Sequence, residues 1–218
     1  MQLFWHFFAG LILAYLLGGI PFALIIGKVF FKTDPRDFGS GNLGATNTFR
    51  VLGGRAAIVV LFLDGLKGAI AIIAMRAIVM PVIASGQAIP DWVMVSALLG
   101  AVVGHAFSPY LGFKGGKGVA ATAGCLFAMQ PLAAFICLGF FILIVAVTRY
   151  VSLGSVCIAA LYPFLIIAFY RTPTYIVFAF IIAGFIIYMH RSNIKRLRAG
   201  TESKLSFSQR GSKPQKND

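Results

Sequence analysis

Acidic residues are scarce in this sequence. Among its 218 residues only 6 are Asp or Glu, against 19 Lys or Arg, while 59% of the chain is hydrophobic and 11% is charged. Soluble domains carry roughly a quarter charged residues, so this composition excludes a soluble globular protein and predicts an integral membrane protein. The basic residues lie almost entirely outside the apolar runs. Anionic lipid and phosphorylated substrates are therefore the expected partners, and nucleic acid is not.

Cysteine and histidine are also scarce, with three residues of each. Cys125, Cys137 and Cys157 lie in apolar runs without metal-ligand spacing, which predicts buried small side chains and no disulfide framework. The sequence also lacks a Gly-x-Ser-x-Gly elbow and any His-x-x-x-x-Asp spacing. We therefore expect no metal and no cofactor, and no covalent nucleophile.

Long apolar runs bounded by charge, Pro or Gly fill most of the chain. A membrane-spanning helix needs roughly 17 to 25 such residues. The first run has no basic n-region or cleavage site, so we expect it to be kept as a helix. The fourth run is short for a crossing, and it could form one kinked helix or a re-entrant pair with the fifth. The predicted spans are 3–27, 56–79, 92–111, 119–131, 132–148, 153–169 and 174–190.

The distribution of Lys and Arg predicts the orientation. With the N-terminus outside, only Arg76 and Arg171 fall on the outer side, Lys67 lies within a span, and the remaining basic residues are cytoplasmic. This favours an all-α integral membrane protein with seven transmembrane helices, the N-terminus outside and the C-terminus cytoplasmic. Residues 1–200 would form a single membrane domain. The polar, basic tail 201–218 is expected to be disordered past about Leu205.

Four polar clusters converge on the cytoplasmic side of this topology. The first, 38–50, joins the first two spans and holds three glycines, two asparagines, two threonines and a serine. Small residues let a ligand approach the backbone, and an Arg can grip a phosphate with two N–H groups. The alternative is a flexible turn with helix caps. The candidate ligand-binding residues here are Ser40, Asn42, Thr46, Asn47 and Arg50.

The second cluster lies inside the second span. Charged residues within a membrane are costly and usually face a cavity or each other, and Asp64 and Lys67 are spaced to pair on one helix face. The pair could be purely structural. We list Lys67 as a candidate that adds positive potential to the site, with Asp64 positioning it.

The third cluster, 104–118, reads Gly-His-Ala-Phe-Ser-Pro-Tyr-Leu-Gly-Phe-Lys-Gly-Gly-Lys-Gly. A glycine-rich turn that leads into a helix offers free backbone N–H groups to a phosphate. A nucleotide-binding P-loop would need longer spacing and a Ser or Thr after the lysine, where Gly118 stands, so ATP binding is disfavoured. The candidates are Gly115, Gly116, Gly118 and Lys117 as the phosphate anchor. His105 joins them, although a lone His is often structural.

The fourth cluster comes from two segments, 148–155 and 190–197. His190 and Asn193 share one face of a helix that continues out of the last span, so both can point to one pocket. Ser152 and Ser155 are candidates for binding substrate or for capping the sixth helix.

Three of these stretches resemble a known family. Ser40-Gly41-Asn42-Leu43-Gly44-Ala45-Thr46-Asn47, Gly104-His105 through Gly115-Gly116-Lys117-Gly118-Val119-Ala120, and His190-Arg191-Ser192-Asn193-Ile194-Lys195-Arg196-Leu197 are similar to motifs of the acyl-phosphate-dependent glycerol-3-phosphate acyltransferases of bacteria, the PlsY family. Leu43 stands where the family often has Pro. The resemblance implies a bacterial inner-membrane enzyme that moves a fatty acyl group from acyl phosphate to the 1-hydroxyl of glycerol 3-phosphate, giving lysophosphatidic acid and phosphate.

The resemblance also implies roles for residues. Ser40, Arg50, Lys117, His190 and Asn193 would hold glycerol 3-phosphate or the reacting groups, and glycines 115–118 would bind the acyl phosphate. Because acyl phosphate is already activated, the reaction needs an oriented hydroxyl and charge stabilisation. Either His190, oriented by Asn193, or the substrate's own phosphate could take the hydroxyl proton.

Two other classes compete with this interpretation. A transporter of a phosphorylated solute would need polar residues along both halves of the membrane, and the outer half offers almost none. A scaffold that binds anionic lipid would explain the basic tail but not the Asn/Gly loop or the Gly-Gly-Lys-Gly turn. We expect a monomer in contact with membrane lipid, and a hand-over of acyl phosphate from the enzyme that makes it is an open alternative.

Overall fold

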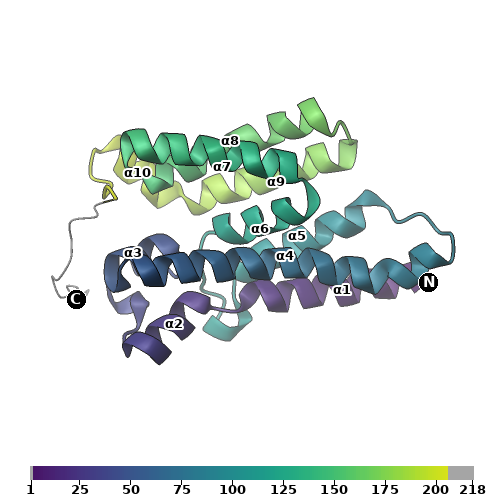
Figure 1. Ribbon diagram of the computed structural model, residues 1–218, viewed down its shortest axis with the longest axis horizontal. Coiled ribbons are helices and arrows are strands. Elements are labelled where there is room, and N and C mark those ends of the chain that lie inside the picture. The colour runs from purple at the N-terminus through teal and green to yellow at the C-terminus, as the bar shows by residue number, and fades with distance from the viewer. Residues whose placement is uncertain (1, 206–218) are drawn as a thin grey trace.

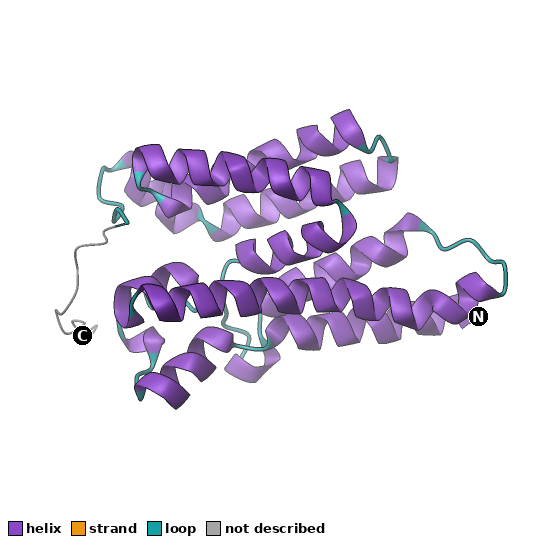
Figure 2. Ribbon diagram, viewed as in Figure 1, coloured by secondary structure: helices purple, strands orange, loops and turns teal. Residues whose placement is uncertain are grey.

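The computed structural model describes residues 2–205, and its regular elements are all helices (Figure 2). The expectation of disorder past Leu205 concerns residues outside this range. In chain order the elements are α1 (Gln2–Gly19), α2 (Phe22–Phe31), η1 (Pro35–Asp37), α3 (Ala45–Leu52), α4 (Gly54–Ala84), α5 (Asp91–Ala106), η2 (Pro109–Leu111), α6 (Val119–Met129), α7 (Pro131–Thr148), α8 (Val151–Phe169), α9 (Pro173–Met189) and α10 (Arg191–Arg198).

Several of these helices are long and apolar enough to cross a bilayer. Five segments of the described chain qualify, and a sixth does if α9 and α10, bent by 59° at His190, count as one span. The chain is therefore a multi-pass helical membrane protein, as predicted. The five segments are Phe4–Phe31, Gly54–Ala84, Asp91–Leu111, Pro131–Thr148 and Val151–Phe169.

Two predicted spans differ from the helices observed. The first continues to Phe31 but breaks between α1 and α2, where Pro21 cannot donate a backbone hydrogen bond. The predicted fourth span forms only the 11-residue helix α6, which at 1.5 Å per residue covers about 16 Å of a hydrocarbon core about 30 Å thick. Helix α6 ends at Gln130, where Pro131 begins α7.

The helices form two layers with α6 between them (Figure 1). Helices α1, α4 and α5 pack together in one layer, and α7, α8 and α9 form the other. Glycines allow α6 to lie close against α4, because a Cβ at Gly124 would overlap the carbonyl of Gly65. Helix α6 therefore begins between the layers, and its N-terminus faces the space that separates them.

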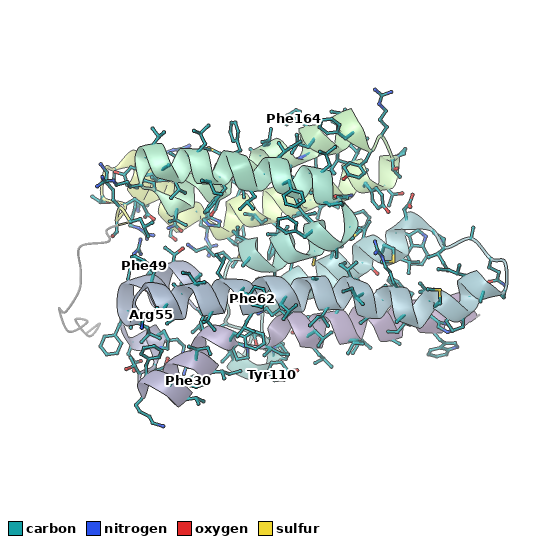
Figure 3. All side chains as sticks on the ribbon, viewed as in Figure 1. Phe30, Phe49, Arg55, Phe62, Tyr110 and Phe164 are labelled. Atoms are coloured by element: carbon teal, nitrogen blue, oxygen red, sulfur yellow. The ribbon has the colours of Figure 1, made fainter. Side chains whose placement is uncertain are left out.

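Large apolar side chains cover the outside of both layers. Phe62 on α4 is 66% exposed and Phe164 on α8 is 61% exposed (Figure 3), whereas Ile72, Met75 and Ile166 are fully buried. An apolar surface of this extent is stable in lipid and not in water.

The end of the described chain turns back onto the helices. After α10, the backbone N–H of Leu205 donates to the carbonyl of Arg149 at 2.7 Å. The Arg50 side chain donates to the carbonyl of Ser203 at 3.2 Å. Residues 201–205, assigned to the polar tail from the sequence, are thus ordered against α3 and the start of α8.

Candidate active site

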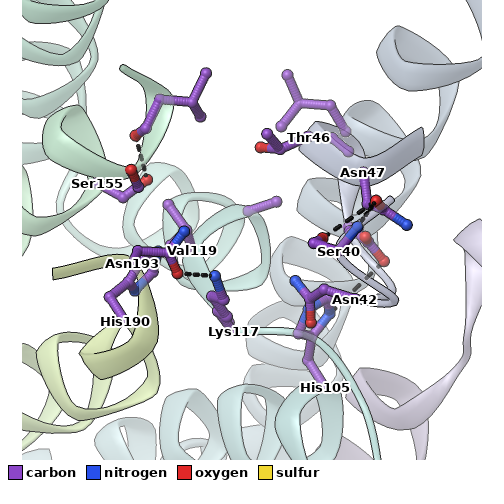
Figure 4. A pocket seen from close by; sticks show the side chains of 18 of the residues that line it. Ser40, Asn42, Thr46, Asn47, His105, Lys117, Val119, Ser155, His190 and Asn193 are labelled. Atoms are coloured by element: carbon purple, nitrogen blue, oxygen red, sulfur yellow. Dashed lines mark hydrogen bonds and ion pairs between the residues drawn. The ribbon is translucent and has the colours of Figure 1, made fainter. Parts of the chain in front are cut away.

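A polar cavity of about 120 Å³ is lined by residues of both layers, including residues of α3 and α10 (Figure 4). All four residues predicted to be catalytic, Arg50, Lys117, His190 and Asn193, line it. The full lining is Ser40, Asn42, Gly44, Ala45, Thr46, Asn47, Arg50, Leu61, Asp64, His105, Lys117, Gly118, Val119, Ala120, Phe141, Val151, Ser152, Ser155, His190, Asn193 and Glu202.

Three predicted substrate-binding residues lie elsewhere. Lys67, Gly115 and Gly116 do not line the polar cavity but a smaller cavity beside it, which also touches Asp64 and His105. The other predicted binding residues, Ser40, Asn42, Thr46, Asn47, His105, Gly118, Ser152 and Ser155, all line the polar cavity.

Asn47 shapes the loop before α3. Its side-chain oxygen accepts hydrogen bonds from the backbone N–H of Ser40 at 2.8 Å and from the Ser40 hydroxyl at 3.1 Å. Its amide group donates to the carbonyls of Pro35 and Phe38. An Asn side chain has two donors and one acceptor oxygen, so all of its polar groups are used within the loop. Asn47 therefore holds Ser40 in position through hydrogen bonds, and its amide N–H groups are not available to a substrate.

The glycine-rich turn rests on His105. The N–H of Gly116 donates to the His105 carbonyl at 3.0 Å, and a Cβ on Gly116 would collide with the His105 ring. Gly118 has φ +85°, a left-handed conformation that favours glycine, and it caps the N-terminus of α6. Between them, the Lys117 ammonium group donates to the Asn193 side-chain oxygen (Figure 4). The turn therefore places the Lys117 side chain in the polar cavity.

Beneath this turn lies a buried ion network. The Lys67 ammonium group is 2.7 Å from an Asp64 carboxylate oxygen and donates to the Ile20 carbonyl at 2.7 Å. Nδ1 of His105 is 3.7 Å from the same carboxylate oxygen. Buried charges are retained when they are paired. Lys67 directs N–H groups to Asp64 and Ile20 and does not line the polar cavity. Lys67 therefore supports the turn from below.

His190 sits at the bend between α9 and α10. Its Nδ1 is 2.8 Å from the carbonyl of Ile186, and a carbonyl can only accept, so Nδ1 carries the proton in the neutral ring. The unprotonated Nε2 is then available as a base. One turn further along α10, Asn193 is buried and faces Lys117.

Glu202 was not found from the sequence. Its carboxylate accepts hydrogen bonds from Ser152 at 2.9 Å, from Asn193 at 2.7 Å and from Arg196 at 2.6 Å. It thereby fixes the amide of Asn193 so that its oxygen faces Lys117. The sequence offered one signal, since Glu202 is the only acidic residue among the basic residues after α9 and before Asp218.

Two cations of the cavity are not neutralised by carboxylates. Within residues 2–205, neither Arg50 nor Lys117 forms an ion pair, whereas Glu202 is paired with Arg196. Burial, with Arg196 and Arg50 nearby, lowers the pKa of Lys117 to about 8, and burial lowers the pKa of Arg50. Burial alone would raise the pKa of Glu202, but its hydrogen bonds from Asn193, Arg196 and Ser152 bring it below the usual value. The cavity is therefore suited to an anion.

A second, apolar cavity of about 140 Å³ adjoins the polar one. It lies among α6, α7, α8 and α9. The two cavities share wall residues, so a molecule with a polar head and an apolar chain can occupy both. The shared residues are Leu61, Val119, Ala120, Phe141 and Ser155.

The fold and these two cavities define a multi-pass membrane protein in which a cavity suited to an anion adjoins an apolar one. A family model described as glycerol-3-phosphate acyltransferase matches residues 8–200. The chain belongs to the glycerol-3-phosphate acyltransferase family.

Individual relatives agree with this membership. The chain is 47% identical over 195 residues to glycerol-3-phosphate acyltransferase 2 of Moorella thermoacetica, covering 89% of this chain and 95% of that protein. It is 40% identical over 233 residues to the Chlorobaculum tepidum glycerol-3-phosphate acyltransferase, covering 92% and 97%. It is also similar to a crystal structure of PlsY, an integral membrane glycerol 3-phosphate acyltransferase, in its glycerol 3-phosphate form. That match has a TM-score of 0.83 and 36% identity, covering 92% of this chain and 96% of the other.

Proposed function

We propose that this protein transfers a fatty acyl group from acyl phosphate to the 1-hydroxyl of sn-glycerol 3-phosphate, giving 1-acyl-glycerol 3-phosphate (lysophosphatidic acid) and phosphate. The observation that carries the proposal is the wall shared by the polar and apolar cavities. It lets a water-soluble phosphate ester and a membrane-soluble acyl donor meet at one point. A PlsY structure described as the lysophosphatidic acid form is also similar to this chain, with TM-score 0.80 and 35% identity.

In this proposal the phosphate of glycerol 3-phosphate binds between Arg50 and Lys117, the two cations without carboxylate partners. Charge-assisted hydrogen bonds from Arg and Lys to phosphate are about twice as strong as neutral ones. The leaving phosphate of the acyl donor lies at the N-terminus of α6, where Gly118 and the residues after it present backbone N–H groups. The acyl chain extends into the apolar cavity.

The chemistry is a direct acyl transfer. The glycerol hydroxyl oxygen bonds to the acyl carbonyl carbon, the bond from that carbon to the phosphate oxygen breaks, and the electron pair leaves with phosphate. The hydroxyl proton goes either to Nε2 of His190 or to a phosphate oxygen of the glycerol 3-phosphate itself. Asn193, held between Glu202 and Lys117, orients the reacting groups. No covalent intermediate on the protein is needed.

The proposed location is the bacterial inner membrane, with the polar cavity facing the cytoplasm and the N-terminus outside. The support is the excess of Lys and Arg at the ends of the helices that surround the polar cavity, against Arg76 and Arg171 at the other ends. This orientation requires seven crossings, with α6 as the short one and the turn before it recessed between the layers. We propose that the protein works as a monomer.

Phosphate release by the purified protein in detergent tests the function directly. The assay contains palmitoyl phosphate with or without glycerol 3-phosphate, EDTA to remove metal ions, and no acyl-CoA. We expect phosphate release that depends on glycerol 3-phosphate, with an equal amount of lysophosphatidic acid formed. A folded protein that is inactive with acyl phosphate but active with acyl-CoA would overturn the donor. Inactivity with both donors would overturn the acyltransferase and favour a transporter of a phosphorylated solute.

A further inference from the structure

Tyr162 lines the far end of the apolar cavity and is hydrogen-bonded to Gln130, which lies outside that cavity. The hydroxyl of Tyr162 on α8 donates to the side-chain oxygen of Gln130 at 2.7 Å, and both residues are buried. Polar side chains are costly in an apolar wall unless they satisfy each other, and this pair does. The bond holds the Tyr162 ring in one position across the cavity.

Beyond this ring lies another small cavity. Tyr162 and Ile182 line both the apolar cavity and the space behind it, which is bounded by Val95, Leu98 and Phe178. The two residues come from different helices, α8 and α9, and each side chain forms part of the partition. Shortening either one would therefore connect the two spaces.

The geometry in front of the partition suits a straight hydrocarbon chain. Ser155, where the polar and apolar cavities meet, lies seven residues before Tyr162 on α8, which places them about 10 Å apart along the helix axis. Three buried alanines, Ala134, Ala159 and Ala183, line the space between. Small side chains from three helices leave a passage that a larger residue would fill.

An acyl chain could also leave the apolar cavity through an opening to the lipid. Leu61, Phe127 and Leu138 line the same cavity while also being exposed to the surroundings of the protein, at 53%, 38% and 41%. Acyl chains could therefore enter from the lipid between α4 and α7. An acyl chain that extended through this opening into the lipid would not contact Tyr162 or Ile182.

We infer that Tyr162 and Ile182 set the length of acyl chain that the apolar cavity accepts. This inference rests on the proposed function, because it assumes that the acyl chain of the substrate occupies that cavity. Chains that reach the partition are accommodated straight, and longer ones must bend toward the lipid opening. The Tyr162 ring, and not its hydroxyl, forms the partition that limits chain length.

The test is a profile of kcat/KM for octanoyl, decanoyl, lauroyl and palmitoyl phosphate, a series whose chains end before and beyond the partition. Tyr162→Ala and Ile182→Ala should raise the lauroyl to octanoyl ratio by about tenfold, the discrimination that one or more methylenes in an apolar pocket provide. Ala159→Phe, which fills the passage, should lower the ratio. Tyr162→Phe keeps the ring and should leave the ratio near that of the wild type. Phe164→Ala, on the lipid-facing side of α8, is the matched control for general effects on that helix.

The outcomes separate this inference from the proposed function. If the wild type transfers no acyl chain from any of these phosphates, the proposed function fails and the inference fails with it. If the wild type is active but Ile182→Ala and Ala159→Phe keep its profile, the chain leaves through the lipid opening and the inference alone is overturned. Should Tyr162→Ala prove too unstable to purify, those two variants decide the matter, since they alter the same passage in opposite directions.

Discussion

At the scale of single residues, the proposed site depends on two cations that form no ion pair within the described residues, although the Glu202 carboxylate lies in the same cavity. Arg50 comes from α3 and Lys117 from the turn before α6, and both line the polar cavity. Burial raises the cost of keeping them charged and also strengthens their attraction for an anion, because less water screens it. A phosphate that binds between them replaces the water they have lost.

Replacing either cation should abolish most activity while the protein stays folded. We expect Lys117→Ala and Arg50→Ala to lose about 2–5 kcal/mol of transition-state stabilisation, the cost of removing a buried charged partner, which is at least about 30-fold in kcat/KM. Lys114→Ala and Arg55→Ala are matched controls, because both side chains are exposed and outside the cavity. Wild-type activity in either cavity variant would contradict the site assignment.

The two possible proton acceptors differ in their dependence on His190. If Nε2 of this residue takes the hydroxyl proton, His190→Ala should lower kcat by about 100-fold or more. If the substrate phosphate takes it, His190→Ala should retain about a tenth of the wild-type kcat, and the ring serves mainly to orient the hydroxyl. Steady-state kinetics at saturating acyl phosphate distinguish the two.

The lowered pKa of Lys117 predicts a pH dependence of glycerol 3-phosphate binding. As pH rises through about 8, Lys117 in the free protein loses its proton, and a neutral amine no longer attracts phosphate. The KM for glycerol 3-phosphate should therefore rise between about pH 7 and 9.5. Lys117→Arg stays protonated in that range, so its KM should change little with pH even if its activity is lower. An equally steep rise in Lys117→Arg would assign the effect to another group.

The sequence predicted the place of some residues and not of others. Residue types and motif positions predicted that Arg50, Lys117, His190 and Asn193 would come together, and all four line one cavity. The pairing of Lys67 with Asp64 was predicted from their spacing on one helix face, and the two side chains are 2.7 Å apart. The commitment of Asn47 to its own loop could not be predicted, because it depends on which partners lie near it in three dimensions. Glu202 was missed because composition placed it in a polar tail, and its contacts with Asn193, Arg196 and the distant Ser152 depend on how that segment folds back.

At the scale of elements, the segment after α10 helps to build the site. Glu202 joins α8, through Ser152, to α10, through Asn193 and Arg196. Sequence composition suggested only a solvated tail here. Hydropathy does not reveal such docking, because the observed contacts of this segment are hydrogen bonds of the Glu202 carboxylate and of the backbone of Ser203 and Leu205.

Removing the Glu202 carboxylate should loosen both α10 and the site. Glu202→Ala leaves buried donors of Asn193 and Ser152 without an acceptor, which we expect to cost about 1–3 kcal/mol per unsatisfied group. Its melting temperature in detergent and its kcat should both fall. Glu202→Gln keeps an oxygen for Ser152 and Asn193 and should be milder in both measurements. A melting temperature unchanged in Glu202→Ala would show that the Glu202 carboxylate contributes nothing to the stability of the fold.

Hydropathy identified the apolar run of helix α6 but not the length of the helix. Its run of apolar residues was recognised, but its 11-residue length follows from where Gly118 and Gln130 terminate it. The close approach to Gly65 of α4, which fixes α6 between the layers, depends on a pair of glycines 59 positions apart in the chain. Local patterns do not specify such pairs.

At the scale of the whole molecule, the distribution of positive charge predicts which end faces the cytoplasm. We expect Gln87→Cys, in the connection between α4 and α5, to react with a membrane-impermeant maleimide on intact cells. Lys114→Cys, in the connection before α6, should react only after lysis. The native cysteines Cys125 and Cys137 are buried and Cys157 is partly buried, so the unaltered chain provides the background. The reverse labelling pattern would invert the proposed orientation.

The shared wall between the polar and apolar cavities has a consequence for how the reaction rate depends on concentration. One substrate arrives from solution in three dimensions, while the other diffuses within a two-dimensional sheet. The rate should then follow the mole fraction of acyl donor in the membrane, and adding inert lipid should slow turnover although the amount of donor per volume is constant. The reaction rate therefore depends on membrane area, which dilutes the acyl donor, as much as on cell volume, which dilutes the soluble substrate.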